Sequence, residues 1–193
     1  MKRNLISIVG IIIFGGLLLI TCKKEDYVQA TSDDVLIGTF FEDHPENFSK
    51  FFELLNTSGN LAFLNAYGTY TCFAPTNEAI DKFLAEKGKT SFGDFTEEEM
   101  DALVRYHIII DTLNSTMFTD GKLPKATMYG QYLTVRTYFE SGEAKLKINK
   151  YSEIINRDFR AANGIIHSIN TVLEPVTKSL AQLIGEDPKF SIF

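Results

Sequence analysis

The sequence has little cysteine and no tryptophan: Cys22 and Cys72 are the only two cysteines in 193 residues. Two cysteines form one disulfide at most, which excludes a small disulfide-rich scaffold. Five prolines and 13 glycines are also too few for a low-complexity or linker-like chain. In contrast, 16 Phe, 8 Tyr and a hydrophobic content of 45% supply the apolar surface of a packed core. One compact domain is therefore predicted.

Basic residues are in deficit as well. The chain has 19 Lys and Arg against 25 Asp and Glu, which gives a formal net charge of −6. A surface that binds nucleic acid normally needs clustered Lys and Arg to displace phosphate counterions. The composition therefore indicates partners other than nucleic acid.

The N-terminus has the pattern of a secretory signal peptide. Lys2 and Arg3 precede an uncharged, mostly apolar stretch over residues 5–20. A membrane-spanning helix needs about 20 apolar residues, and this stretch is shorter and contains Gly10, Gly15 and Gly16. We expect residues 1–21 to be a signal peptide, with an uncleaved membrane anchor as the alternative.

The end of this stretch resembles a bacterial lipobox, in which the cysteine is acylated and becomes the new N-terminus. The segment is Leu19–Cys22, with Thr21 in place of the usual small residue. The following Lys23–Asp26 is similar to the export signal of Bacteroidetes surface lipoproteins. These resemblances imply lipidation of Cys22 and a surface-exposed outer-membrane lipoprotein, held there because two acyl chains anchor stably. Residues 22–34 are polar and without periodicity, which predicts a tether.

The folded part, expected over residues 35–177, begins with helical patterns. Phe48, Phe51, Phe52 and Leu55 recur at helical spacing, and a short second helix is expected over Leu61–Tyr67. Thr76 or Asn77 can cap a third helix that ends at Gly88. A capping box at Thr96–Glu99 starts a fourth, whose apolar face includes Met100, Leu103, Val104, His107 and Ile108.

Beyond Pro124 the period changes from 3.6 to 2. Leu133, Val135, Thr137 and Phe139 are expected to share the inward face of a strand, which a turn at Glu140–Glu143 joins to a second strand with Leu146 and Ile148 inside. Two more strands are expected over Ile154–Phe159 and Ile165–Ile169, separated by Asn163-Gly164, a dipeptide that tolerates positive φ. A strand is also expected around Cys72, and the thiol of Cys72 is expected to be buried. Helices followed by strands indicate an α+β fold.

Three segments occur in an order that resembles the fasciclin domain. They are Thr69–Ile80 and Asn163–Pro175, which are similar to the two signature boxes of that family, and Tyr106–Ile109, which is similar to its Tyr-His motif. Cys72 stands where the family usually has Val, and Asn170 where it often has Asp. The resemblance implies a wedge-shaped β-sandwich with several packed α-helices, in proteins that mediate adhesion or surface contacts.

The same resemblance marks Tyr106 and His107 as a possible interaction motif, because in some animal relatives this segment binds integrin. We do not infer integrin binding for this chain, because a bacterial lipoprotein gives no reason to expect it. Independently of the family, His107 lies on an apolar helix face and His167 at an inward strand position, and neither has the spacing of local metal ligands. Both are therefore expected to be buried, hydrogen-bonded structural histidines. No cofactor or metal is predicted, and Asp111–Leu113 resembles a Bacteroidetes O-glycosylation acceptor with Thr112 as the attachment site.

The C-terminal segment 178–193 contains a short motif that also occurs earlier in the chain. Phe190–Phe193 repeats the Phe-Ser-x-Phe pattern of Phe48–Phe51. Because fasciclin domains commonly occur in tandem, this segment is a possible start of a second domain; the alternative is a coincidence in a C-terminal helix.

Three functions from different classes remain. The leading hypothesis is a non-enzymatic, lipid-anchored surface module for adhesion to an extracellular protein or glycan. The second is an accessory lipoprotein of an outer-membrane importer complex for glycans or nutrients. The third is a hydrolase that uses His167 with Ser168, for which the sequence offers no third catalytic partner.

Overall fold

The computed structural model describes residues 35–178 and 180–186. The predicted signal peptide, Cys22 and the tether lie outside the described residues, as does the Phe-Ser-x-Phe pattern at the C-terminus. The helices are α1 (Ile37–Asp43), α2 (Pro45–Thr57), α3 (Leu61–Leu64), α4 (Asn77–Glu86), α5 (Glu97–Tyr106) and α6 (Leu180–Glu186), with 3₁₀ turns at Phe92–Asp94 and Ser115–Met117. The strands are β1 (Tyr70–Pro75), β2 (Ile108–Ile109), β3 (Gly121–Lys122), β4 (Thr134–Glu140), β5 (Glu143–Ile148), β6 (Ser152–Ala161) and β7 (Gly164–Ile169).

Helices α4 and α5, the longest after α2, each begin at a capping residue that the sequence predicts. The Thr76 hydroxyl accepts a hydrogen bond from the Ala79 N–H and so caps α4. At α5 the predicted capping box is complete, because Thr96 and Glu99 each bond the other's backbone N–H. Both helix starts are confirmed.

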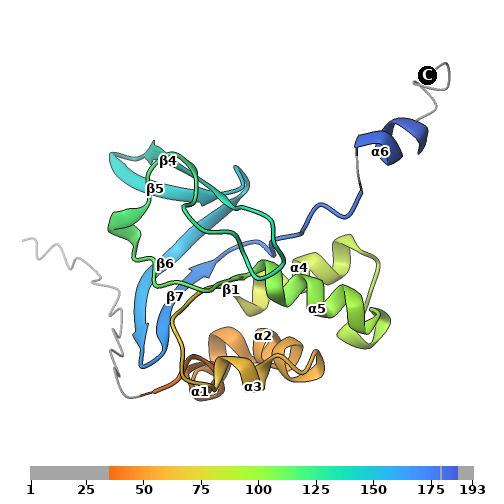
Figure 1. Ribbon diagram of the computed structural model, residues 1–193, viewed down its shortest axis with the longest axis horizontal. Helices are drawn as coiled ribbons and strands as arrows, with labels where there is room; N and C mark the ends of the chain where they lie inside the picture. Colours follow the sequence, from red (N-terminus) through yellow and green to blue (C-terminus); the bar gives the residue numbers. More distant parts are fainter. Residues whose placement is uncertain (1–34, 179, 187–193) are drawn as a thin grey trace, which may run out of the picture.

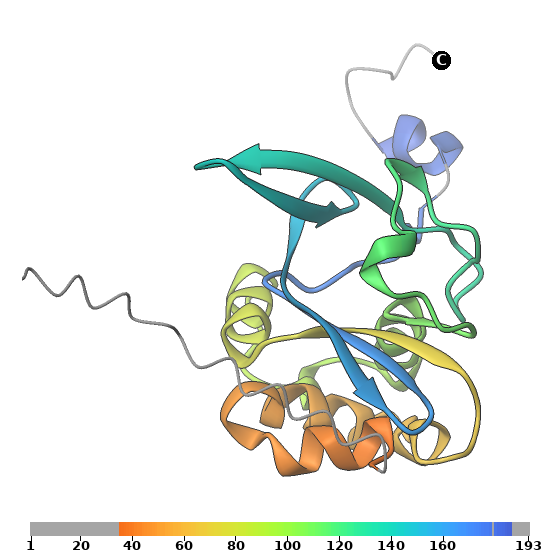
Figure 2. The same cartoon turned by 90° about the vertical axis from the view of Figure 1, so that its left-hand side faces the viewer.

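The strands form one sheet in the order β2-β1-β7-β6-β5-β4-β3. Strand β7 lies between β1 and β6; it runs parallel to β1 and antiparallel to β6. Only two residue pairs, Lys147 with Glu153 and Ile148 with Ser152, join β5 to β6. The sheet can therefore bend sharply there, and Figures 1 and 2 show the β4–β5 hairpin turned away from the plane of β1 and β7. The expected sandwich thus takes the form of a single curled sheet with helices packed on it, and the α+β class is confirmed.

Two hydrophobic cores lie on opposite faces of β7. Ile166 belongs to the core beneath helices α1, α2, α4 and α5, whereas Ile169 belongs to the core enclosed by the curled half of the sheet. Successive side chains of a strand point to opposite faces, so one strand serves both cores. Leu133 and Val135 are buried in the second core, as the alternation predicted. Figure 1 shows the helices below the central strands and the hairpin on the other side.

The turn between β6 and β7 is held against β1 and against the helical layer. A Cβ on Gly164 would lie 2.0 Å from the carbonyl oxygen of Tyr70, so only glycine allows β1 to approach this closely. The preceding Asn163 is buried; its amide donates to the carbonyls of Leu64 (2.8 Å) and Ala66 (2.9 Å). Its side-chain oxygen accepts from the Ile37 N–H at 2.9 Å. Asn163 is therefore a hydrogen-bonded link between the turn and the helices, and the positive φ that we expected of this dipeptide belongs to Gly164.

Two further expectations were wrong in detail. Phe139, expected inside, is 77% exposed, because it lies next to the β4–β5 turn where the hairpin extends past the core. The short helix at Leu61 ends at Leu64 and does not reach Tyr67, which is 93% exposed. Helix α1, which the pattern analysis missed, is only seven residues long and buries Phe40 and Phe41.

Candidate functional site

The Tyr-His motif lies at the junction of α5 and β2. Tyr106 is the last residue of α5, and its hydroxyl accepts a hydrogen bond from the Asn149 amide at 2.9 Å. Burial raises the pKa of Tyr106, although the Asn149 bond acts in the opposite direction. The Tyr129 ring packs edge-on against it, with centroids 6.3 Å apart. The motif residue thus connects α5 to the loop after β5.

His107 is fully buried, and both of its ring nitrogens are bonded to the backbone. Nδ1–H donates to the Leu103 carbonyl at 2.7 Å, and Nε2 accepts from the Leu173 N–H at 2.9 Å. These partners require the neutral ring, because a carbonyl only accepts and an amide only donates. Burial lowers the pKa of His107 to about 4, with the Leu103 bond opposing the shift.

His167 is also buried and neutral, with the opposite tautomer. Its Nε2–H donates to the Leu113 carbonyl at 2.9 Å, and Nδ1 accepts from the Asp158 N–H at 3.3 Å. Burial lowers the pKa of His167. The ring stacks on Phe73 with centroids 5.4 Å apart, on the side of the second core. The neighbouring Ser168 lies on the other face of β7 and lines a groove, so the two side chains do not form a nucleophile–base pair.

The expectation that both histidines are structural is confirmed. The role of Tyr106 and His107 as an interaction motif stays a prediction, since the described contacts of both side chains are internal. Thr112 lies on the surface, and its glycosylation is likewise untested. Cys72 is buried, and burial raises the pKa of its thiol far above the ordinary value. Among residues 35–178 and 180–186, no three His, Cys, Asp or Glu side chains gather as a metal site.

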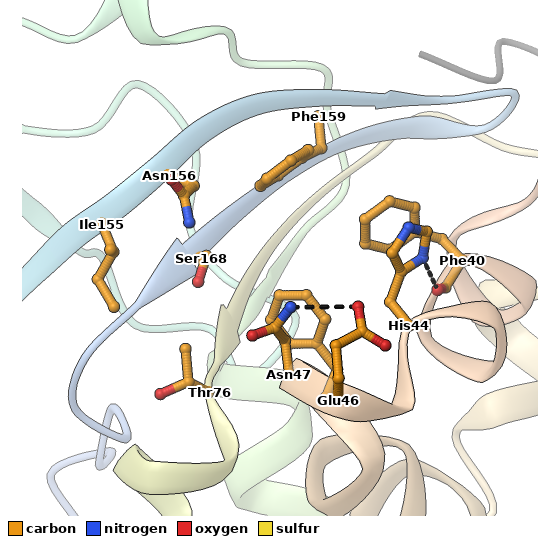
Figure 3. A pocket seen from close by; sticks show the side chains of 10 residues that line it. Phe40, His44, Glu46, Asn47, Thr76, Ile155, Asn156, Phe159 and Ser168 are labelled. Atoms are coloured by element: carbon orange, nitrogen blue, oxygen red, sulfur yellow. Dashed lines mark hydrogen bonds between the residues drawn. The ribbon is translucent and has the colours of Figure 1, made fainter. Parts of the chain in front are cut away.

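A groove lies away from the Tyr-His motif, between the α1–α2 junction and the face of β6 and β7 that carries Ser168. Its volume is about 490 Å³, within the usual range for ligand pockets. We call it the β6–α2 groove; it is lined by Phe40, His44, Glu46, Asn47, Phe48, Thr76, Ile155, Asn156, Phe159 and Ser168. Figure 3 shows these side chains facing a common space.

Irregular strand pairing opens this groove. The register of β6 against β7 shifts on both sides of Asn156, and Asp158 has a positive φ of 64°. Shifts of this kind bend a strand and redirect its side chains. On the helical side, Pro45 begins α2 directly after His44, whose Nδ1 bonds the Phe40 carbonyl at 2.8 Å. The His44 ring stacks on Phe40 with centroids 4.2 Å apart and forms one rim of the groove.

Aromatic rings form the walls, and polar groups form the floor. Phe40 contacts both Phe48 and Phe159, with centroids 6.1 and 5.7 Å apart. Asn156 and Ser168 are cross-strand partners, and Figure 3 shows the amide of one and the hydroxyl of the other directed toward the groove. Ser168 is only 1% exposed, yet no described residue bonds its hydroxyl, nor the Asn156 side chain. Sequence reasoning missed the groove, because nothing local signals a register shift.

Comparison with known proteins decides the family. The sequence-family model of the fasciclin domain matches residues 46–175 of this chain. The chain belongs to the fasciclin domain family. Protein sll1483 of Synechocystis is 30% identical to this fasciclin chain over 156 residues, which cover 80% of the chain and 83% of the relative. Human periostin is 31% identical over 154 residues, and the pig transforming growth factor-beta-induced protein ig-h3 is 33% identical over 149 residues.

These two animal proteins are much longer than the matched region. The alignments cover 78% and 76% of this chain but only 18% of periostin and 20% of ig-h3. A solved fasciclin domain pair from the insect cell adhesion molecule Fasciclin I superposes with a TM-score of 0.52 and 22% identity, over 75% of this chain and 50% of that one. This similarity confirms the fasciclin-like fold predicted from the sequence.

Proposed function

We propose that this chain is a non-enzymatic surface module that binds an extracellular protein or glycan, held at the outer membrane by a lipid on Cys22. The observation that carries the proposal is the fasciclin match over residues 46–175, together with the structural similarity to a cell adhesion molecule. Binding is favoured over catalysis because the imidazoles of His107 and His167 are buried, neutral and fully hydrogen-bonded. The Ser168 hydroxyl faces away from His167.

The binding half of the proposal is tested with the full-length chain coated on beads. We expect the beads to adhere to bacterial or host cells, or to retain a protein or glycan from their surfaces, above the level of beads coated with serum albumin. Beads coated with the heat-denatured chain distinguish fold-dependent adhesion from general stickiness. Adhesion no greater than that of either control would contradict the proposal.

The anchoring half rests on Leu19–Cys22 and on Lys23–Asp26, and it has its own test. Cells that express the full chain are fed radiolabelled palmitate, and we expect label in the wild type and in Cys72→Ser. Cys22→Ser should carry none. Replacing Lys23–Asp26 by alanines should keep the label but remove the protein from the reach of protease added outside intact cells. Equal labelling of Cys22→Ser and the wild type would refute lipidation at this cysteine.

A further inference from the structure

We propose that the β6–α2 groove binds a neutral sugar residue within a glycan chain. This inference rests on the proposed binding function and specifies its ligand and its site. The polar floor, the aromatic walls, the charge of the lining and a neighbouring hollow each support it.

The floor presents hydrogen-bonding groups that the folded chain does not use. Ser168 is buried, its hydroxyl faces the groove, and no described residue bonds it. The hydroxyl itself is open to the groove, because no fully buried side-chain nitrogen or oxygen of the described residues lacks a partner, and a ligand in the groove can therefore reach it. Asn156, directly across the β6–β7 pair, adds an unpaired amide that can both donate and accept. Together they match the paired donor and acceptor character of sugar hydroxyls.

The walls suit the apolar side of a sugar ring. Phe48 and Phe159 line the groove from α2 and β6, and Phe40 packs against both rings. A pyranose ring has C–H groups on its faces and hydroxyls around its edge, so it can pack on Phe159, the half-buried ring of the three, while its edge reaches Asn156 and Ser168; Phe40 and Phe48 are buried and support that ring from behind. Pockets of this type use an apolar lining for affinity and a few polar groups for orientation.

The charge of the lining favours a neutral ligand. None of the described residues that line the groove is Lys or Arg, and Glu46 places a carboxylate at its rim. An anionic ligand such as a phosphate or a uronic acid would therefore meet repulsion without a compensating cation.

A second, separate hollow lies beside the groove. This hollow of about 370 Å³ lies where β5 and β6 separate, and it shares Ile155 with the β6–α2 groove. It is lined partly by charged side chains, among them Lys145, Glu153 and Arg157. Ile155 is 48% exposed and lines both spaces. A second hollow beside the first leaves room for a further sugar residue of a glycan chain.

The experiment measures binding of defined hexasaccharides of glucose, xylose, mannose and galactose to the full-length chain by isothermal calorimetry. Since residues 5–20 are apolar, the protein is kept in a detergent without a sugar head group. We expect binding of at least one neutral hexamer and none of a galacturonic acid hexamer. Ser168→Ala and Asn156→Ala should each weaken binding about fivefold to tenfold, the usual effect of one lost hydrogen bond.

Two control variants separate the groove from the rest of the fold. Ser152→Ala removes another buried serine, whose hydroxyl bonds the Thr171 carbonyl outside the groove, and Asn56→Ala removes an exposed asparagine of α2. Both should bind sugar as the wild type does. Ser168→Ala should also leave the urea midpoint unchanged or raised, because no folded-state hydrogen bond is lost, whereas Ser152→Ala should lower it.

The remaining outcomes overturn the proposal. If the beads adhere but no neutral hexamer binds, the glycan site is wrong while the adhesive function stands. If a hexamer binds equally to Ser168→Ala, Asn156→Ala and the wild type, the site lies elsewhere on the chain. If neutral hexapeptides bind and Ser168→Ala weakens them, the groove recognises protein and not sugar.

Discussion

The Nε2 atom of His107 accepts a hydrogen bond from the backbone N–H of Leu173 at 2.9 Å, across 66 positions of the sequence. This bond ties the C-terminal end of α5 to the segment that follows β7. The same residue is bonded through Nδ1 to Leu103, and its backbone carbonyl accepts from the Phe73 N–H at 2.9 Å. His107 thus connects a helix, the strand β1 and the end of the second signature box.

We expect His107→Ala to destabilise the fold by about 2–5 kcal/mol, because it leaves a cavity and two buried backbone groups without partners. Urea unfolding followed by circular dichroism measures the change in free energy. His44→Ala is the control: His44 is only partly buried and has one backbone hydrogen bond, so its loss should cost about 1 kcal/mol. Equal effects of the two substitutions would show that His107 is not the structural link described above.

Stability should fall as the pH is lowered from about 6.5 to about 4. Burial depresses the pKa of His107 to about 4, from an ordinary value of 6.5, so the unfolded chain takes up a proton that the folded chain resists. The stabilisation is complete above pH 6.5 and decreases by about 1.4 kcal/mol per pH unit below it, until the folded-state pKa is reached. The pKa of His167 is lowered too, which adds in the same direction.

His107→Gln isolates this contribution, because glutamine has no titration in this range. Urea unfolding at pH 7.5, 6, 5 and 4.5 should show a shallower loss of stability in the variant than in the wild type. Parallel pH profiles would mean that His107 does not keep its depressed pKa in the folded protein.

Asn163→Asp should destabilise the fold more than Asn163→Ala does. The aspartate has nearly the same shape, but it places a carboxylate against the carbonyls of Leu64 and Ala66, to which the amide now donates. We expect a loss of about 3 kcal/mol or more for Asp and about 1–3 kcal/mol for Ala. Thermal unfolding at pH 7 ranks the two variants. A tolerated aspartate would show that Asn163 is not buried against these carbonyls.

Gly164→Ala should prevent the close approach of β7 and β1, since the added Cβ would lie 2.0 Å from a backbone oxygen that cannot move aside. We expect Gly164→Ala to lower the free energy of unfolding by several kcal/mol, or to abolish the yield of soluble protein. Gly93→Ala is the matched control, because its Cβ would meet nothing closer than 3.5 Å. Comparable soluble yields and melting temperatures for the two variants would contradict this account of the turn.

Features with a local cause could be predicted from the sequence. The caps at Thr76 and Thr96 involve atoms only three residues apart, and the alternation around Leu133 and Val135 directly marks a half-buried strand. Hairpin residues Ser141 and Gly142 have the positive φ that a tight turn needs, and the segment was recognised as a turn.

Features that depend on distant partners could not be predicted. The bond of Asn163 to the Ile37 N–H spans 126 positions, and nothing near Asn163 in the sequence indicates it. Phe139 keeps the strand alternation but lies beyond the core that this pattern normally implies. The β6–α2 groove requires the register shifts around Asn156 and a helix corner from the other end of the chain, so neither segment alone signals a site.

The position of β7 between β1 and β6 also sets an order of events during synthesis. The ribosome makes β1 early, but it makes β7, the parallel neighbour of β1, only after about half the chain length. Because β7 contributes Ile166 to one hydrophobic core and Ile169 to the other, both cores are incomplete until β7 has been made. At about 5–20 residues per second, the nascent chain waits roughly 5–20 s between these two strands. Until the ribosome has passed Ile169, the chain therefore remains open to chaperones, proteases and any export machinery that accepts only unfolded polypeptide.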